Sequence, residues 1–179
     1  GDTKSIINGK RYLYYLLGTS IIFFLPAIIF TYILTGTLDY KVGGIFTSYN
    51  NTAIYILVIL YLFGIAKSAV MPFHKWLPSA MVAPTPVSAL LHAVAVVKSG
   101  VFIMLKVFLF IFGVDVLTQS GANIIIILFA SFTIISSSFI ALNQDNIKLR
   151  LAYSTIGQLS YIVLATAILA PYSILAAVL

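Results

Sequence analysis

The chain of 179 residues is 61% hydrophobic and only 8% charged, which is too apolar for a domain that covers itself with a wetted surface. Its net charge of +6 comes from ten basic residues scattered through apolar sequence, which argues against a nucleic-acid-binding patch. Four aspartates, with no glutamate and no cysteine, exclude a paired-carboxylate hydrolase, a thiolate metal site and a disulfide. We therefore expect an integral membrane protein.

Long apolar stretches separated by short polar clusters predict an all-α, polytopic transmembrane helix bundle with about five spans. No cleavable leader precedes the first stretch, so we expect the apolar segments to stay in the membrane. Residue 1 is Gly rather than Met, and the last residues read like the start of a further span, so we expect a fragment of a longer subunit. We treat residues 1–179 as a single transmembrane domain. The predicted spans lie at about 12–36, 52–82, 87–112, 122–142 and 151–170.

The first span contains Pro26, which a membrane helix can accommodate as a mild kink. Basic residues near the span ends are unevenly divided between the two sides of the membrane. This bias predicts that the amino end and the loop before the fifth span face the cytoplasm. One side carries Lys4, Lys10, Arg11, Lys75, Lys148 and Arg150, and the other carries Lys41 and Lys106.

A lysine and a proline interrupt the second span. Lys67 lies roughly 22 Å of helical rise past its start, well inside a hydrocarbon layer about 30 Å thick. A charge there costs about 3 kcal/mol on insertion scales, so the amine should face protein or water, and burial would ease loss of its proton. Pro72 removes a helical donor and obstructs the carbonyl of Ser68. We expect a discontinuous helix near Pro72, with a hydrated site beside Lys67.

A simpler interpretation of this segment is also open. Lys67 would then end a shorter span, and Pro72 would begin a surface loop among the lipid headgroups. On either interpretation His74, Lys75 and Trp76 fit an interfacial belt, and His74 is expected to be an anchor rather than a ligand.

The third span contains a second lysine. Lys98 lies roughly 17 Å into it, which favours a functional ionisable group over a structural lysine paired with a neighbouring helix. His92 lies about 120° around the helix from Lys98. It is either a relay that titrates near neutral pH or a packed, hydrogen-bonded histidine. Ser88 and Ser99 share the face of His92 and are candidates to line a polar path.

The fourth and fifth spans both carry polar side chains, but we expect different roles for them. Hydroxyls of the fourth span, such as that of Thr133, are expected to bond back to their own helix. In the fifth span, Ser154, Gln158 and Tyr161 follow at i, i+4 and i+7. They form one polar stripe that must face protein or water.

Two stretches carry a family resemblance. "KSAVMPFHKWLPSAMVAPTPVSALLHAVAVVKSGVF" closely resembles the signature of the antiporter-like proton-conducting membrane subunits. These subunits occur in respiratory complex I, membrane-bound hydrogenases and Mrp-type sodium/proton antiporters. "NQDNIKLRLAYSTIGQLSYIVLA" is similar to a second stretch of that family, and the two together cover roughly residues 64 to 166.

The resemblance implies specific roles. Lys67 would be the central protonatable group of a half-channel, and the next helix would supply His92 and Lys98. A partner glutamate would precede Gly1, and the exit half-channel would follow Leu179. We expect no catalytic site, no cofactor and no metal in this chain.

The resemblance also implies partners and a location. The partners would be other membrane subunits of a multisubunit complex and the lipid bilayer. The transported ions would be protons, with sodium as a second candidate. The membrane would be a bacterial or archaeal cytoplasmic membrane. We expect an Mrp-type antiporter first, and a proton-pumping subunit of complex I (NADH:quinone oxidoreductase) or of a hydrogenase second. A structural anchor without transport is the alternative of another class, and an intramembrane enzyme lacks a credible nucleophile and base.

Overall fold

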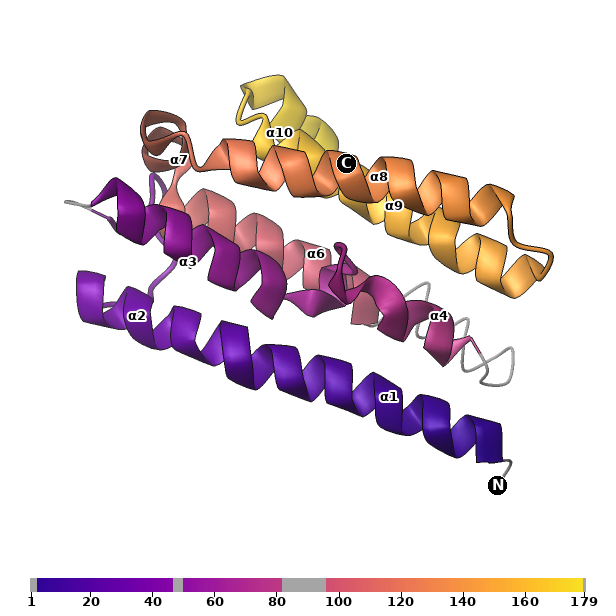
Figure 1. Ribbon diagram of the computed structural model, residues 1–179. Coiled ribbons are helices and arrows are strands. Elements are labelled where there is room, and N and C mark those ends of the chain that lie inside the picture. Colours follow the sequence, from indigo (N-terminus) through magenta and orange to yellow (C-terminus); the bar gives the residue numbers. More distant parts are fainter. Residues whose placement is uncertain (1–2, 47–49, 82–95, 179) are drawn as a thin grey trace.

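The computed structural model describes residues 3–46, 50–81 and 96–178, and within these ranges the chain is all-helical, as predicted. Figure 1 shows the helices lying side by side in a bundle, with the long first helix along one edge. The α-helices are α1 (Thr3–Thr19), α2 (Leu25–Thr35), α3 (Asn51–Gly64), α4 (Trp76–Ala80), α6 (Val96–Lys106), α7 (Val114–Ser120), α8 (Asn123–Leu142), α9 (Ile147–Ala167) and α10 (Pro171–Val178).

The first predicted span is continuous through Pro26. A π-helical turn, η1 (Ser20–Phe24), joins α1 to α2, and Pro26 lies in the first turn of α2. Proline has no N–H to bond the carbonyl four residues back. The amide of Leu25 instead donates to the carbonyl of Ser20, five residues back, so the wider π turn carries the chain past the proline.

The second predicted span is discontinuous, which confirms the predicted break near Pro72. We define the break as residues 65–75, between the end of α3 at Gly64 and the start of α4 at Trp76. It contains two 3₁₀ turns, η2 (Ala66–Ser68) and η3 (Phe73–Lys75). In Figure 1, α3 and α4 lie nearly end to end, with α3 beside α2 and α4 beside α1. A surface loop among headgroups does not fit, because Trp76 is fully buried.

Helices occupy the described parts of all five predicted spans apart from the break in the second, but not all of these helices are equally suited to cross a membrane. Among the described residues, two helices are long and apolar enough to cross a membrane: Ile6–Thr35 and Asn123–Leu142. The helical segment Val97–Phe112 ends in a π turn, η5 (Val107–Phe112), and is followed by α7 after a bend of 80°. If this segment and α7 form one span, they give a third membrane-crossing element. The apolar helix α3 is shorter, and α9 is long enough but carries more polar side chains. The total of five spans stays a prediction.

Basic residues gather at one end of the bundle. Figure 1 places the start of α1, the end of α4 and the turn between α8 and α9 at that end. This arrangement agrees with the predicted grouping of loop charges, while the side of the membrane that they face stays a prediction. The described basic residues of this end are Lys10, Arg11, Lys75, Lys148 and Arg150.

A hydrogen bond between two buried hydroxyls joins α2 to α3. Thr31 Oγ1 lies 3.0 Å from the hydroxyl of Tyr61, and Thr31 also donates to the carbonyl of Ala27 at 2.8 Å. Since Thr31 has one hydroxyl hydrogen, Tyr61 is the donor in the bond between the helices. The Tyr61 ring also packs edge-on against Phe24 and Phe112, so this residue lies where three helical segments meet.

We predict that Tyr61→Phe lowers the free energy of unfolding of the full-length subunit in detergent by about 1 kcal/mol, the net value of one such bond. Thr31 keeps its bond to Ala27, so the loss should not be larger. The matched control is Tyr32→Phe on α2, where the ring is 57% exposed and no change is expected. Equal losses in the two variants would contradict this role of Tyr61.

Candidate functional site

The backbone polar groups of the break are satisfied by side chains from several elements. Trp76 Nε1 donates to the carbonyl of Ala66 at 2.9 Å, across the break. The amide of Met71 donates to Thr133 Oγ1 of α8 at 3.1 Å. Ser68 donates its hydroxyl to the carbonyl of Ile65 at 2.8 Å. Unwound backbone in an apolar bundle needs such partners, because lipid supplies none. The conformation of the break is therefore stabilised by specific hydrogen bonds to its backbone.

Two sequence predictions need correction here, and a third is confirmed but incomplete. His74 and Trp76 are not interfacial anchors, because they are 8% and 0% exposed. The ring of Trp76 packs edge-on against Tyr12 of α1, and that of His74 lies 6.0 Å from Tyr153 of α9. Thr133 does bond back to its own helix, as predicted, but it also accepts from the break. A sequence pattern could not reveal this second role, because the amide that Thr133 accepts from lies about sixty residues away.

Two glycines let neighbouring helices approach the break closely. A Cβ on Gly64 would meet the backbone nitrogen of Phe24 in η1 at 2.6 Å. A Cβ on Gly100 of α6 would meet the carbonyl carbon of Lys67 at 2.5 Å. Ala69, two residues after Lys67, is fully buried and has φ of 57°, a left-handed conformation that costs a non-glycine residue about 1–2 kcal/mol. The surrounding helices thus hold Lys67 in a defined backbone conformation.

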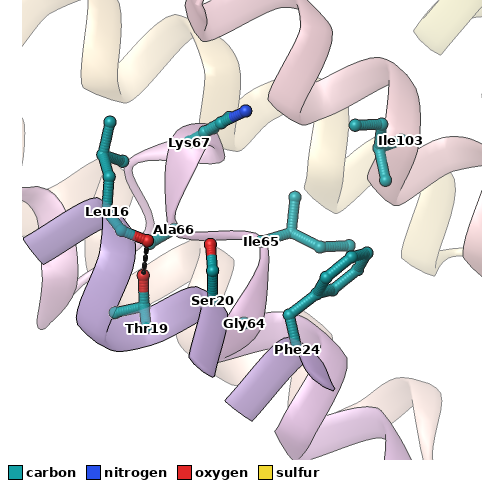
Figure 2. Close-up of a pocket in the computed structure, with 9 residues that line it drawn as sticks. All are labelled: Leu16, Thr19, Ser20, Phe24, Gly64, Ile65, Ala66, Lys67 and Ile103. Atoms are coloured by element: carbon teal, nitrogen blue, oxygen red, sulfur yellow. Dashed lines mark hydrogen bonds between the residues drawn. The ribbon is translucent and has the colours of Figure 1, made fainter. Parts of the chain in front are cut away.

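Lys67 lines a small pocket between η1, the break and α6. The pocket has a volume of about 60 Å³, and its other lining includes Thr19, Ser20 and Ile103. Figure 2 shows the Ser20 hydroxyl pointing toward the break, and the Lys67 side chain beyond it with its nitrogen directed away from Ser20. The Lys67 side chain is exposed in this chain, and within the described ranges its ammonium makes no ion pair or hydrogen bond. It is free to contact water or a further segment.

Lys98 lines a different and larger hollow. This groove, of about 450 Å³, lies between α6, α9 and α10. Gln158 and Thr155 of α9 line it together with Lys98, so the structure brings two of the predicted residues together. Gly100 is the α6 residue that contacts Lys67, and it follows Lys98 by two residues. Two residues correspond to a rotation of about 200° around the helix axis, so Gly100 and Lys98 lie on nearly opposite faces of α6. The two lysines therefore lie on different sides of that helix.

The other predicted site residues are dispersed. His92 and Ser88 lie outside the described residues. Ser99 is half-buried on α6, and Pro72 is exposed in the break. Two members of the polar stripe on α9, Ser154 and Tyr161, are exposed, as is Gln158. Their roles in a polar path stay predictions.

These features define a class of membrane-embedded helix bundle, in which a broken helix holds a lysine among apolar neighbours. The chain belongs to the NADH:quinone oxidoreductase/Mrp antiporter transmembrane family, which matches residues 3–179. The expected family membership is thereby confirmed.

Curated relatives come from both branches of this family. The chain is 42% identical over 142 residues to "Putative antiporter subunit mnhA2" of Staphylococcus aureus, which covers 77% of this chain and 17% of that protein. It is 40% identical over 136 residues to NAD(P)H-quinone oxidoreductase chain 5 of Synechocystis, covering 74% and 19%. It is 35% identical over 148 residues to the chloroplastic NAD(P)H-quinone oxidoreductase subunit 5 of Nuphar advena, covering 76% and 19%.

A solved structure has the same fold. A chain of the Mrp complex from Dietzia sp. matches 99% of this chain with a TM-score of 0.83 and 30% identity, and the match covers 19% of that chain. Each of these matches thus covers less than a fifth of the length of the similar protein.

We predict that Gly100→Ala displaces the backbone of Lys67, because the new Cβ would lie 2.5 Å from its carbonyl carbon. Overpacking of this kind costs about 1–3 kcal/mol. The thermal unfolding midpoint of the full-length subunit should fall. As a control, Gly18→Ala in α1 places its Cβ where no atom lies within 4 Å, and it should leave stability unchanged or slightly raised. A Gly100→Ala variant as stable as Gly18→Ala would contradict the close contact.

Proposed function

We propose that this chain is part of the proton-translocating membrane subunit of a multisubunit complex. Lys67 takes up and releases protons, and bound water with His92 as relay passes them towards Lys98. The residues proposed to line this path are Ser88, Ser99, Ser154, Gln158 and Tyr161.

The observation that carries the proposal is the position of Lys67 inside the break. A membrane helix that stops at Gly64 and resumes at Trp76 needs added hydrogen-bond partners for its backbone. An intramembrane lysine is likewise costly unless it is used. The interrupted helix and the intramembrane lysine are both energetically costly, and both occur at the pocket beside Lys67. This coincidence supports a function at that pocket.

The relay must go around or through α6. Lys67 and Lys98 line separate hollows on different sides of that helix, so a direct transfer between the two amines is not available within the described residues. A bridging group or ordered water is required, and we propose His92, which lies outside the described residues, as the bridge.

We propose an Mrp-type monovalent cation/proton antiporter as the owning complex. The Mrp complex chain that matches almost the whole length of this chain, and the 42% identity to mnhA2, support it. A subunit of an NAD(P)H-quinone oxidoreductase is the second candidate, supported by the 40% identity to chain 5 of Synechocystis. A sodium gradient that drives proton movement in vesicles would favour the first, and transport that requires quinone reduction would favour the second.

We also propose the setting of the subunit. Other membrane subunits surround it, and the end that carries Lys10 and Arg11 faces the cytoplasm. The membrane is a bacterial or archaeal cytoplasmic membrane, which the Staphylococcus relative supports, although relatives from chloroplasts are known as well.

We predict that Lys67→Met and Lys98→Met each slow proton transport by the assembled complex in proteoliposomes by about ten-fold or more, since each removes a proton-carrying group. Lys75→Met, in the same break but exposed at the basic end, is the matched control and should transport normally. Assembly is checked separately by the yield of intact complex. Normal transport by a complex that lacks both lysines would instead support the structural-anchor alternative.

A further inference from the structure

We propose that the first turns of α1 bind the headgroup of an anionic phospholipid. The site is a surface hollow of about 330 Å³ at the basic end of the bundle, and it is lined by Ile7, Lys10, Arg11, Tyr14 and Tyr15. None of these residues belongs to the proposed transport path, so this inference is independent of the proposed function.

The hollow carries two positive charges that its own helix does not balance. Lys10 and Arg11 are adjacent and exposed, and within the described ranges neither side chain makes an ion pair. Helix α1 (Thr3–Thr19) contains no acidic residue. Two neighbouring cations repel each other and favour an anion that contacts both. A phosphate group is suited to this role, because it offers several acceptor oxygens and arginine can bind it through two parallel hydrogen bonds.

The length of the span places the hollow at the depth of lipid headgroups. The apolar helical span Ile6–Thr35 has 30 residues, which is about 45 Å of helical rise. The hydrocarbon layer is about 30 Å thick and needs about 20 residues, whereas the bilayer with its headgroups is about 40–45 Å thick. The helix ends at Gly36, so Lys10 and Arg11 at the opposite end of the span extend beyond the hydrocarbon. Tyrosines such as Tyr14 and Tyr15 are enriched at this boundary.

An exposed apolar row continues from the hollow toward the middle of the membrane. Tyr14, Leu17 and Ile21 follow Lys10 on one face of the helix, at steps of four, three and four residues. Their side chains are 76%, 57% and 62% exposed in this chain. In Figure 1, α1 lies along one edge of the bundle. A phospholipid has the same order of parts, with its phosphate at headgroup depth and its acyl chains along the apolar row.

A helix from another membrane segment is the competing occupant of this face. Such a helix would have to carry a carboxylate opposite Lys10 and Arg11, because burial of cations without a counter-charge is strongly unfavourable. The bilayer supplies phosphates at this depth without that requirement. Charge complementarity therefore favours the lipid.

The experiment uses the assembled complex in detergent, depleted of lipid and then titrated with phosphatidylglycerol, with the retained lipid counted by native mass spectrometry. We expect the double variant Lys10→Gln/Arg11→Gln to retain one lipid fewer per subunit. Recovery of that lipid should need a concentration about twenty- to thirty-fold higher. This ratio corresponds to about 1 kcal/mol for each of the two cations, since 1.4 kcal/mol is tenfold.

Two matched controls test whether the position and the charge both matter. Lys148→Gln/Arg150→Gln on α9 removes the same charge from the same end of the bundle, and it should retain the lipid. Lys10→Arg/Arg11→Lys keeps both charges at the hollow and should also retain it. If the neutral double variant does not assemble, Lys10→Gln alone replaces it, with an expected weakening of about five-fold.

Two further ligands distinguish the sources of the anion. Phosphatidylcholine has the acyl chains without the net charge, and inorganic phosphate has the charge without the chains. Neither should displace phosphatidylglycerol when added at the same concentration. Displacement by inorganic phosphate would mean that the hollow binds any small anion, and it would overturn the lipid site.

Three other outcomes would also overturn this inference. They are equal retention of phosphatidylglycerol by Lys10→Gln/Arg11→Gln and by the α9 control, equal retention of phosphatidylcholine, and no retained lipid in the unmodified complex together with a carboxyl crosslink from Lys10 to another helix. The last would assign the face to a protein segment. None of these outcomes affects the proposed function, which the variants of Lys67 and Lys98 test.

Discussion

The break between α3 and α4 depends on one constraint: each buried backbone N–H and C=O needs a hydrogen-bond partner where no bulk water reaches. Eleven residues, 65–75, leave the regular helix here. The partners come from Trp76 beyond the break and from Thr133 on α8. Each of these side chains is fixed by the packing of its own helix. The conformation of the break is therefore determined by the whole bundle.

Packing of the neighbouring helices against the break also fixes the position of Lys67. Close approach of α6 at Gly100 fixes the backbone of Lys67, and close approach of η1 at Gly64 fixes the end of the preceding helix. Between these two contacts lies the small pocket that Lys67 helps to line, and the Lys67 side chain itself is exposed.

The sequence predicted the broad fold well, because span length and hydrophobicity are local properties. It predicted the discontinuity at Pro72, since a proline in a membrane helix acts on its own neighbours. It did not predict that the break begins at Ile65, because the cause lies in contacts with other helices. For the same reason Trp76 was placed in the interface: a tryptophan near a predicted span end looks the same whether it faces lipid or caps a distant carbonyl. The π turn at Ser20 left no sequence signal other than Pro26 beyond it.

Charge balance indicates what the lysines still lack. The acidic residues of the described chain, Asp39, Asp115 and Asp145, are all exposed and lie in loops or in the first turn of α7, far along the sequence from either lysine. Hydroxyls, carbonyls and an amide line the two hollows, and none of these carries a full negative charge. A protonated amine in an apolar bundle needs either water or a counter-charge. The described residues that line the two hollows include no carboxylate, so the amines depend on water or on a counter-charge from outside these residues. Both lysines are exposed, which leaves their hollows open to either.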